Sequence, residues 1–213
     1  MSKISLEPNA SGAGTFTLAA PNSNTNRTLN LPDESGVLFS DGTGVPGAAV
    51  TGQLASSNMP AGSVIQVVST TKTDTFSLNL PSGESADIPG LSVNITPIST
   101  QSKILTLLTV CGHNGVEAGI HCNVKRNGTT LAVPDTSSSF DPVLAGTFGG
   151  TDNRFVSSST GIIIDTPSTT SSVTYKAVVV SIAASSRTHF INRPASLGRN
   201  LSVSTITVME IAG

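Results

Sequence analysis

The sequence predicts an all-β protein, in which an extended N-terminal attachment segment precedes a jelly-roll-like β-sandwich head. Three observations support this prediction. No long window combines a 3.6-residue apolar period with helix-forming residues. Short runs rich in Val, Ile and Thr recur between clusters of Gly, Pro, Asn, Asp and Ser, as in proteins built from many short strands. The chain also contains 31 serines and 27 threonines, whereas only 11 % of its 213 residues are charged.

Residues 1–62 form the first predicted domain, which is poor in apolar side chains. Its apolar residues are short pairs, chiefly Phe16 with Leu18 and Leu29 with Leu31, and residues 41–62 are a Gly-rich connector. Ordering a backbone costs about 1–2 kcal/mol per residue, and so few apolar groups do not offset that cost. We therefore expect this segment to pack against other chains, in an oligomer or a larger assembly.

Residues 63–213 form the second predicted domain, the β-sandwich head. Asn127-Gly128 lies between two strand-like runs and predicts a tight hairpin. Residues 161–165 and 173–183 have the apolar character of buried strands, and the terminal strand places its odd-numbered and even-numbered residues on opposite faces. The expected strands comprise residues 63–70, 104–110, 120–126, 129–133, 161–165, 173–183 and 203–211.

Composition argues against several partners. The 11 Lys and Arg residues are scattered, and phosphate binding requires clustered cations, so no nucleic-acid partner is expected. The longest apolar run, residues 177–184, is far shorter than the roughly 20 residues of a spanning helix, so no membrane insertion is expected. The start of the chain lacks a signal-like apolar core. We therefore expect a chain that is not exported by a signal peptide of its own.

Two cysteines and two histidines lie close together in the sequence, as Cys111, His113, His121 and Cys122. Their spacing differs from that of common zinc modules, and strand alternation would point His121 and Cys122 in opposite directions. We expect two buried, unbridged cysteines and two histidines at the rim of the sheet, with no metal and no cofactor.

The sequence contains no recognisable catalytic motif. It has no Gly-x-Ser-x-Gly elbow and no phosphate-binding glycine loop. Its carboxylates are few and far apart, whereas glycosidase chemistry needs two of them held within a few ångström. We therefore expect a protein that is not an enzyme.

Two long polar stretches, residues 134–154 and 185–200, are the candidate binding loops. Long loops on a rigid β scaffold are where binding residues gather, although ordinary solvated loops have the same composition. The second stretch suggests recognition of an anionic or carbohydrate surface. The candidate residues are Phe140, Phe148, Asp152, Arg154, Arg187, His189 and Arg193.

Four segments of the chain resemble tail-fibre-like proteins of tailed bacteriophages, many of them from marine and cyanobacterial hosts. Residues 17–21 (TLAAP) and 27–38 (RTLNLPDESGVL) are similar to a module that precedes a Gly-rich step in those proteins. Residues 62–77 (GSVIQVVSTTKTDTFS) and 204–213 (STITVMEIAG) resemble the opening and the ending of their C-terminal domain.

This resemblance implies a virion protein, a short homotrimeric fibre whose distal head binds a host cell-surface glycan or protein. It also implies attachment to other virion proteins through Phe16, Leu18, Leu29 and Leu31. Many relatives carry a long shaft, whereas here only about 60 residues precede the head. A capsid or tail decoration protein that stabilises the particle is therefore the alternative.

Overall fold

The computed structural model describes residues 11–15, 17, 22, 24–26, 28, 59–116, 119–131, 143–196 and 200–213. The chain divides into two units, Met1–Ala49 and Val50–Gly213, and all the described strands lie in the second. The attachment residues Phe16, Leu18, Leu29 and Leu31, and the candidate binding residue Phe140, lie outside the described residues.

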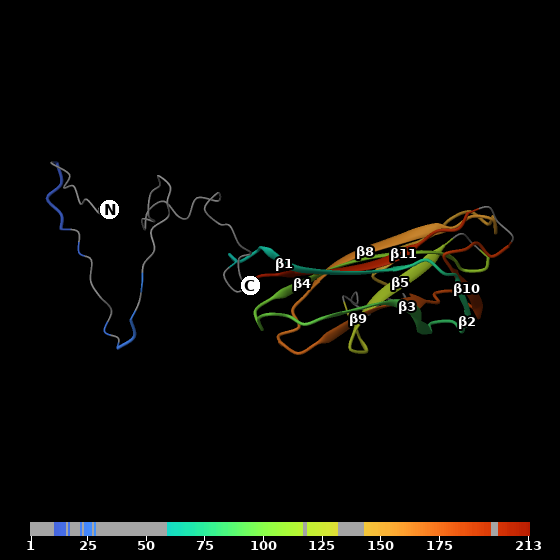
Figure 1. The fold of residues 1–213 in the computed structure, drawn as a ribbon. Helices are drawn as coiled ribbons and strands as arrows, with labels where there is room; N and C mark the ends of the chain where they lie inside the picture. Colours follow the sequence, from blue (N-terminus) through green and yellow to red (C-terminus); the bar gives the residue numbers. More distant parts are fainter. Residues whose placement is uncertain are drawn as a thin grey trace. The chain divides into compact units, whose positions relative to one another are not determined.

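The described residues form β-strands and no helix, so the all-β prediction is confirmed (Figure 1). The strands are β1 (Val64–Lys72), β2 (Phe76–Leu80), β3 (Ser85–Ile95), β4 (Lys103–His113), β5 (Ile120–Arg126), β6 (Thr129–Thr130), β7 (Ala145–Thr147), β8 (Ser157–Asp165), β9 (Val173–Val180), β10 (Arg187–Ile191) and β11 (Ser204–Ile211). None of the described residues belongs to a helix long and apolar enough to cross a bilayer.

The strands form two antiparallel sheets, which Figure 1 shows as two layers. One sheet has the order β1-β11-β4-β10-β2, with β8 on the other edge of β4. The other has the order β3-β9-β5-β6, with β7 also paired to β5. The long strands thus stack as β1-β11-β4-β8 over β3-β9-β5-β7, which is the strand order of a jelly roll. The pair β2 and β10 extends the first sheet at one end of the sandwich.

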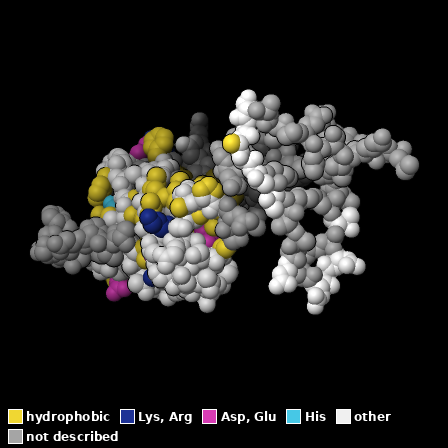
Figure 2. Space-filling model, turned by 90° about the vertical axis from the view of Figure 1, so that its left-hand side faces the viewer, with side chains coloured by type: hydrophobic (Ala, Val, Ile, Leu, Met, Phe, Trp, Pro, Cys, Tyr) yellow, Lys and Arg dark blue, Asp and Glu magenta, His cyan; other side chains and the backbone are white. Residues whose placement is uncertain are grey.

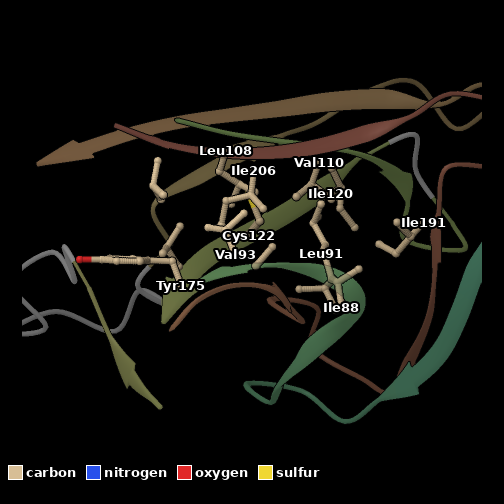
Figure 3. Packing of buried hydrophobic residues seen from close by; sticks show 14 of the residues in the cluster. Ile88, Leu91, Val93, Leu108, Val110, Ile120, Cys122, Tyr175, Ile191 and Ile206 are labelled. Atoms are coloured by element: carbon tan, nitrogen blue, oxygen red, sulfur yellow. The ribbon is translucent and has the colours of Figure 1, made fainter. Parts of the chain in front are cut away.

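The core lies between the two sheets, because alternate side chains of each strand point inward. Leu108, Val110 and Ile206 of the first sheet point toward Ile120 and Cys122 of the second (Figure 3). Tyr175, the largest fully buried side chain, closes one end of this core. With a single tyrosine and no tryptophan in the chain, the core is mainly aliphatic.

Strand β8 differs from the sequence prediction, which treated residues 161–165 as a buried strand. Ile163 is buried, but Ile162 and Ile164 are 61 % and 62 % exposed. The strand lies at the edge of its sheet, and only one of its faces packs on the core. Three consecutive isoleucines resemble a strand covered on both faces, and the sequence does not show that one face is left uncovered.

The predicted Asn127-Gly128 hairpin is confirmed. Lys125 pairs with Thr130 and Arg126 with Thr129, which leaves Asn127 and Gly128 as a two-residue loop. Both residues have positive φ, 47° and 92°, as a type I′ turn requires. The loop joins β5 to β6 and so fixes the register of this edge of the second sheet.

The cysteine prediction is confirmed, and the histidine prediction is wrong. Cys111 and Cys122 are buried and unbridged, and they belong to different sheets. His113 and His121 are also buried, at 0 % and 2 % exposure, rather than standing at a rim. The end of β4 is covered by β10, and the outer face of β5 is covered at His121 by residues from the β7 region.

Candidate functional site

Along one face of strand β10, the side chains become more exposed from one end of the strand to the other. Ile191 is fully buried in the core, His189 is 2 % exposed, and Arg187 is half-buried. Residues two apart on a strand share a face, so the three side chains follow one line from the core toward solvent. The sequence analysis treated residues 185–200 as a loop, which is wrong for 187–191. These residues pair with β2 over Phe76–Leu80.

Two glycines let the end of β4 approach β10. A Cβ atom on Gly112 would lie 2.5 Å from the carbonyl oxygen of Phe190, and one on Gly115 would lie 2.7 Å from that of Thr188. Gly115 also has a φ of +84°, which favours glycine. Side chains at either position would push β10 away, so the sequence at the end of β4 fixes the position of Arg187 and His189.

A cavity of about 280 Å³ opens beside β10, and we call it the β10 pocket. Three separate stretches of the chain meet there: residues 114–121 from the end of β4 to β5, Phe148 after β7, and residues 182–189 from the end of β9 into β10. Its lining residues are Asn114, Val116, His121, Phe148, Ile182, Ala183, Ala184, Arg187 and His189. The pocket therefore combines an apolar wall with a small number of polar groups, as ligand sites usually do.

Phe148 and His121 form one side of the pocket. Their ring centroids lie 4.8 Å apart, with the ring planes at 61°, so the contact is edge-on. His121 also packs against Gly146, where any side chain would collide with the imidazole. Phe148 nevertheless stays 71 % exposed, which leaves its ring available to a ligand.

The ionisable side chains that line the pocket are one guanidinium and two imidazoles, and no carboxylate lines it. Burial, together with the neighbouring His121, lowers the pKa of His189 to about 4, so this side chain is neutral at pH 7. Both of its ring nitrogens are buried and have no hydrogen-bond partner among the described residues. Arg187 belongs to none of the ion pairs found in the described part of the chain. The pocket therefore presents a cation that has no ion-pair partner among the described residues, beside a buried imidazole whose donor and acceptor are both unsatisfied.

The structure brings together three of the seven candidate binding residues, namely Phe148, Arg187 and His189. Asp152 and Arg154 pair with each other instead, with a 2.6 Å contact between Arg154 Nη2 and Asp152 Oδ2. This pairing lowers the pKa of Asp152 to about 2. Neither residue lines the β10 pocket.

Arg193 also lies outside the pocket. Its guanidinium stacks 4.8 Å from the centre of the Phe190 ring, and its Nε donates a hydrogen bond to the carbonyl oxygen of Pro194. The two stretches named in the sequence analysis nevertheless meet a second time. The backbone N–H and the hydroxyl of Ser196 both donate to the carbonyl oxygen of Asn153, at 3.1 Å.

Sequence reasoning missed several lining residues, among them His121, Asn114 and the short apolar run Ile182–Ala184. His121 was weighed only as a metal ligand, and the small residues after β9 carry no chemical signal of their own. Among the residues that the structure describes, no group of three His, Cys, Asp or Glu side chains lies close enough to hold a metal ion.

Comparison with known proteins gave distant structural likenesses only. No model of a known protein family matches the chain, and no curated protein matches it. The structure of infectious bursal disease virus, Gt strain, is similar over 70 % of this chain and 38 % of that one, with 14 % identity and a TM-score of 0.39. The T=1 particles derived from the same virus match over 69 % and 40 %, with 15 % identity and a TM-score of 0.34.

This chain therefore spans about two fifths of the length of those two viral chains. The order of the strands within the two sheets, rather than these likenesses, carries the jelly-roll assignment.

Proposed function

We propose that this chain is a structural protein of a phage virion, a short trimeric fibre that binds the host cell surface through the β10 pocket. The observation that carries the proposal is the pocket itself. It joins Phe148, Arg187 and His189, which come from two separate stretches that the sequence had already marked as candidate binding loops. Three such sites on one fibre would strengthen weak individual contacts through joint engagement.

The outer face of the first sheet supports self-association as part of this proposal. The strand register places Val67, Met209, Leu105 and Ile164 in one row across four strands. The next row holds Ser69, Thr207, Leu107 and Ile162. Val67, Ile162 and Ile164 are each more than half exposed. Contiguous apolar surface of this kind is typical of protein interfaces.

A second copy of the chain is the occupant that we propose for this face. The two rows contain no charged side chain, so three copies can bring this face together around a three-fold axis without desolvating a charge. Figure 2 views the protein from another side, the left-hand side of Figure 1, and hydrophobic side chains are exposed there too, with a few basic and acidic side chains among them. By composition the N-terminal segment is too poor in apolar residues to fold alone, which also favours association between copies.

Attachment to the particle is assigned to residues 1–40, with Phe16, Leu18, Leu29 and Leu31 as the apolar contacts to other virion proteins. This assignment follows from the resemblance of residues 17–21 and 27–38 to the phage module. The virion is the expected location.

Adsorption of phage particles tests the proposal. Particles that carry Phe148→Ala should form in normal numbers and keep their stability, yet adsorb poorly to host cells. Normal adsorption by particles that lack the protein altogether would overturn the fibre proposal.

The alternative is a capsid or tail decoration protein, and the exposed apolar rows on the first sheet favour it in one respect. The same face would suit a neighbouring virion subunit as well as a second copy. In that case particles without the protein should lose integrity on mild heating while adsorbing at the normal rate.

A further inference from the structure

We propose that the β10 pocket binds an acidic monosaccharide unit, a single sugar ring that bears a carboxylate. The inference rests on the proposed role of the head in host-surface binding, and it names the ligand of that same site. Four features of the described residues lead to it: the size of the pocket, its aromatic side, its buried imidazole and its unpaired guanidinium.

Size limits the ligand to one ring. The pocket volume of about 280 Å³ lies just below the roughly 300–1,000 Å³ that small-ligand sites span. Arg187 and His189 are two residues apart on β10, which separates their backbones by about 7 Å. A single sugar ring with its substituents covers that span, whereas a longer saccharide would have to project into solvent.

Phe148 provides the surface on which a sugar ring can pack. The edge-on contact with His121 holds its ring in place, and 71 % of the residue remains exposed. The C–H groups on one side of a sugar ring are apolar, so they pack well against an aromatic face. Ile182, Ala183 and Ala184 extend this apolar wall.

His189 requires a ligand that both donates and accepts hydrogen bonds. A neutral imidazole has one donor nitrogen and one acceptor nitrogen. In His189 both are closed to solvent and have no partner among the described residues, which is costly, and a turn of the imidazole toward the pocket would let a ligand satisfy them. Hydroxyl groups on a sugar ring both donate and accept, and they meet this requirement better than a purely anionic group does.

Arg187 selects for a carboxylate. Its planar guanidinium donates two parallel hydrogen bonds to a carboxylate, and no acidic side chain of the pocket competes for it. A phosphate group fits less well, because the pocket offers one guanidinium and no helix N-terminus. The order along β10 then sets the orientation, with the carboxylate toward the rim at Arg187 and the hydroxyl groups deeper at His189.

Calorimetric titration of the full chain with free sugars tests the inference. Glucuronic or galacturonic acid should bind more tightly than glucose or galactose. Arg187→Gln should weaken binding of the acids about tenfold or more, since hydrogen bonds to charged groups are worth about 1.5–3 kcal/mol. Neutral sugars should be affected little by this change. Lys176→Gln removes an exposed positive charge outside the pocket and is the matched control.

Phe148→Ala provides a second test, because it should weaken the binding of acidic and neutral sugars alike without unfolding the protein. Equal binding of acidic and neutral sugars, tighter binding of glucose 6-phosphate, or no effect of Arg187→Gln would each overturn the inference. Adsorption and sugar binding are measured separately. If the particles adsorb through this protein but the protein does not bind acidic sugars, the sugar inference is wrong and the fibre proposal stands. If the protein binds acidic sugars but has no role in adsorption, the fibre proposal is wrong and the sugar inference stands.

Discussion

The Phe148 ring stands edge-on to the imidazole of His121, with 4.8 Å between ring centroids, at the mouth of the β10 pocket. The two residues belong to different parts of the chain, and glycine at position 146 makes room for the imidazole. A side chain that is mostly exposed is thus held in one place by a residue that is buried. This combination separates the contribution of Phe148 to binding from its contribution to stability.

Phe148→Ala should therefore abolish cell binding at little cost in stability. An edge-on aromatic pair contributes about 0.5–1.5 kcal/mol, so the free energy of unfolding should fall by about 1 kcal/mol. Urea denaturation measures the stability, and labelled protein on host cells measures the binding. A variant that binds cells as well as the wild type would show that the pocket is not the contact surface.

Ile164→Lys on the outer face of β8 should dissociate the oligomer without unfolding the chain. The side chain is 62 % exposed, so a lysine there costs the isolated chain little, whereas it would bury a charge in a paired face. Light scattering should give about three times the 21.6 kDa chain mass for the wild type and a lower mass for the variant.

Ser172→Lys adds the same charge at an exposed position in the turn before β9 and serves as the control. It should leave the mass unchanged. A well-folded wild-type monomer would remove the assignment of this face to a second copy and would move the decoration protein ahead of the fibre.

Local signals in the sequence were enough to predict most of the sandwich. Asn127-Gly128 specified its hairpin by backbone geometry alone, a near-continuous apolar run located β4, and alternation located β11. The face of β8 that remains uncovered was not predictable, because the Ile162–Ile164 run has the same composition whether one or both faces are packed. Strand β10 was missed because its polar residues resemble a loop, and only its pairing with β2 and β4 makes it a strand.

The candidate site was predicted only in part, because it too depends on strand pairing between distant parts of the chain. Exposed aromatic and basic residues in long polar stretches pointed to Phe148 and Arg187. The meeting of these stretches depends on long-range pairing and on close backbone approach at Gly112 and Gly115. His121 could not be assigned to the pocket, because its position depends on which face of β5 the residues after β7 cover.

The buried histidines should make the protein less stable as the pH falls from about 6.5 to about 4. Burial lowers the pKa of His189 to about 4 and also lowers the pKa of His113, while both groups regain ordinary values on unfolding. The unfolded chain therefore binds more protons in this pH range, and the free energy of unfolding rises with pH across it. His189 is faced by His121 and Arg187, and His113 by Asp152, whose charge opposes the shift of His113.

Urea denaturation at a series of pH values measures this effect. The pKa shift of His189 alone corresponds to a change of at most about 3 kcal/mol in the free energy of unfolding, at 1.36 kcal/mol per pKa unit. His189→Gln should reduce the loss in the free energy of unfolding between pH 6.5 and 4. The loss that remains should be the part due to His113. A decline of the same size in the variant would show that His189 is not the group that titrates.

Tyr175 should resist ionisation well above the ordinary tyrosine range. Its hydroxyl donates a 2.6 Å hydrogen bond to Asp165 Oδ2, and Arg126 Nη1 donates to both oxygens of the same carboxylate at 2.7 and 2.8 Å. Burial is the largest cause that raises the pKa of Tyr175, and its hydrogen bond to the negatively charged Asp165 is the next. A phenolate at this position would be desolvated beside a carboxylate. Since this is the only tyrosine in the chain and there is no tryptophan, ultraviolet absorbance reports on it alone.

An alkaline titration of the folded protein should show no phenolate near pH 10 and a sharp rise only where the protein unfolds. Asp165→Asn keeps the shape of the side chain but removes its charge, so it should lower the pKa of Tyr175 while burial keeps it above the ordinary value. Tyr175→Phe retains the pair between Arg126 and Asp165 and should lower the free energy of unfolding by only about 1 kcal/mol. Reversible ionisation near pH 10 in the folded wild type would contradict the buried hydrogen bond between Tyr175 and Asp165.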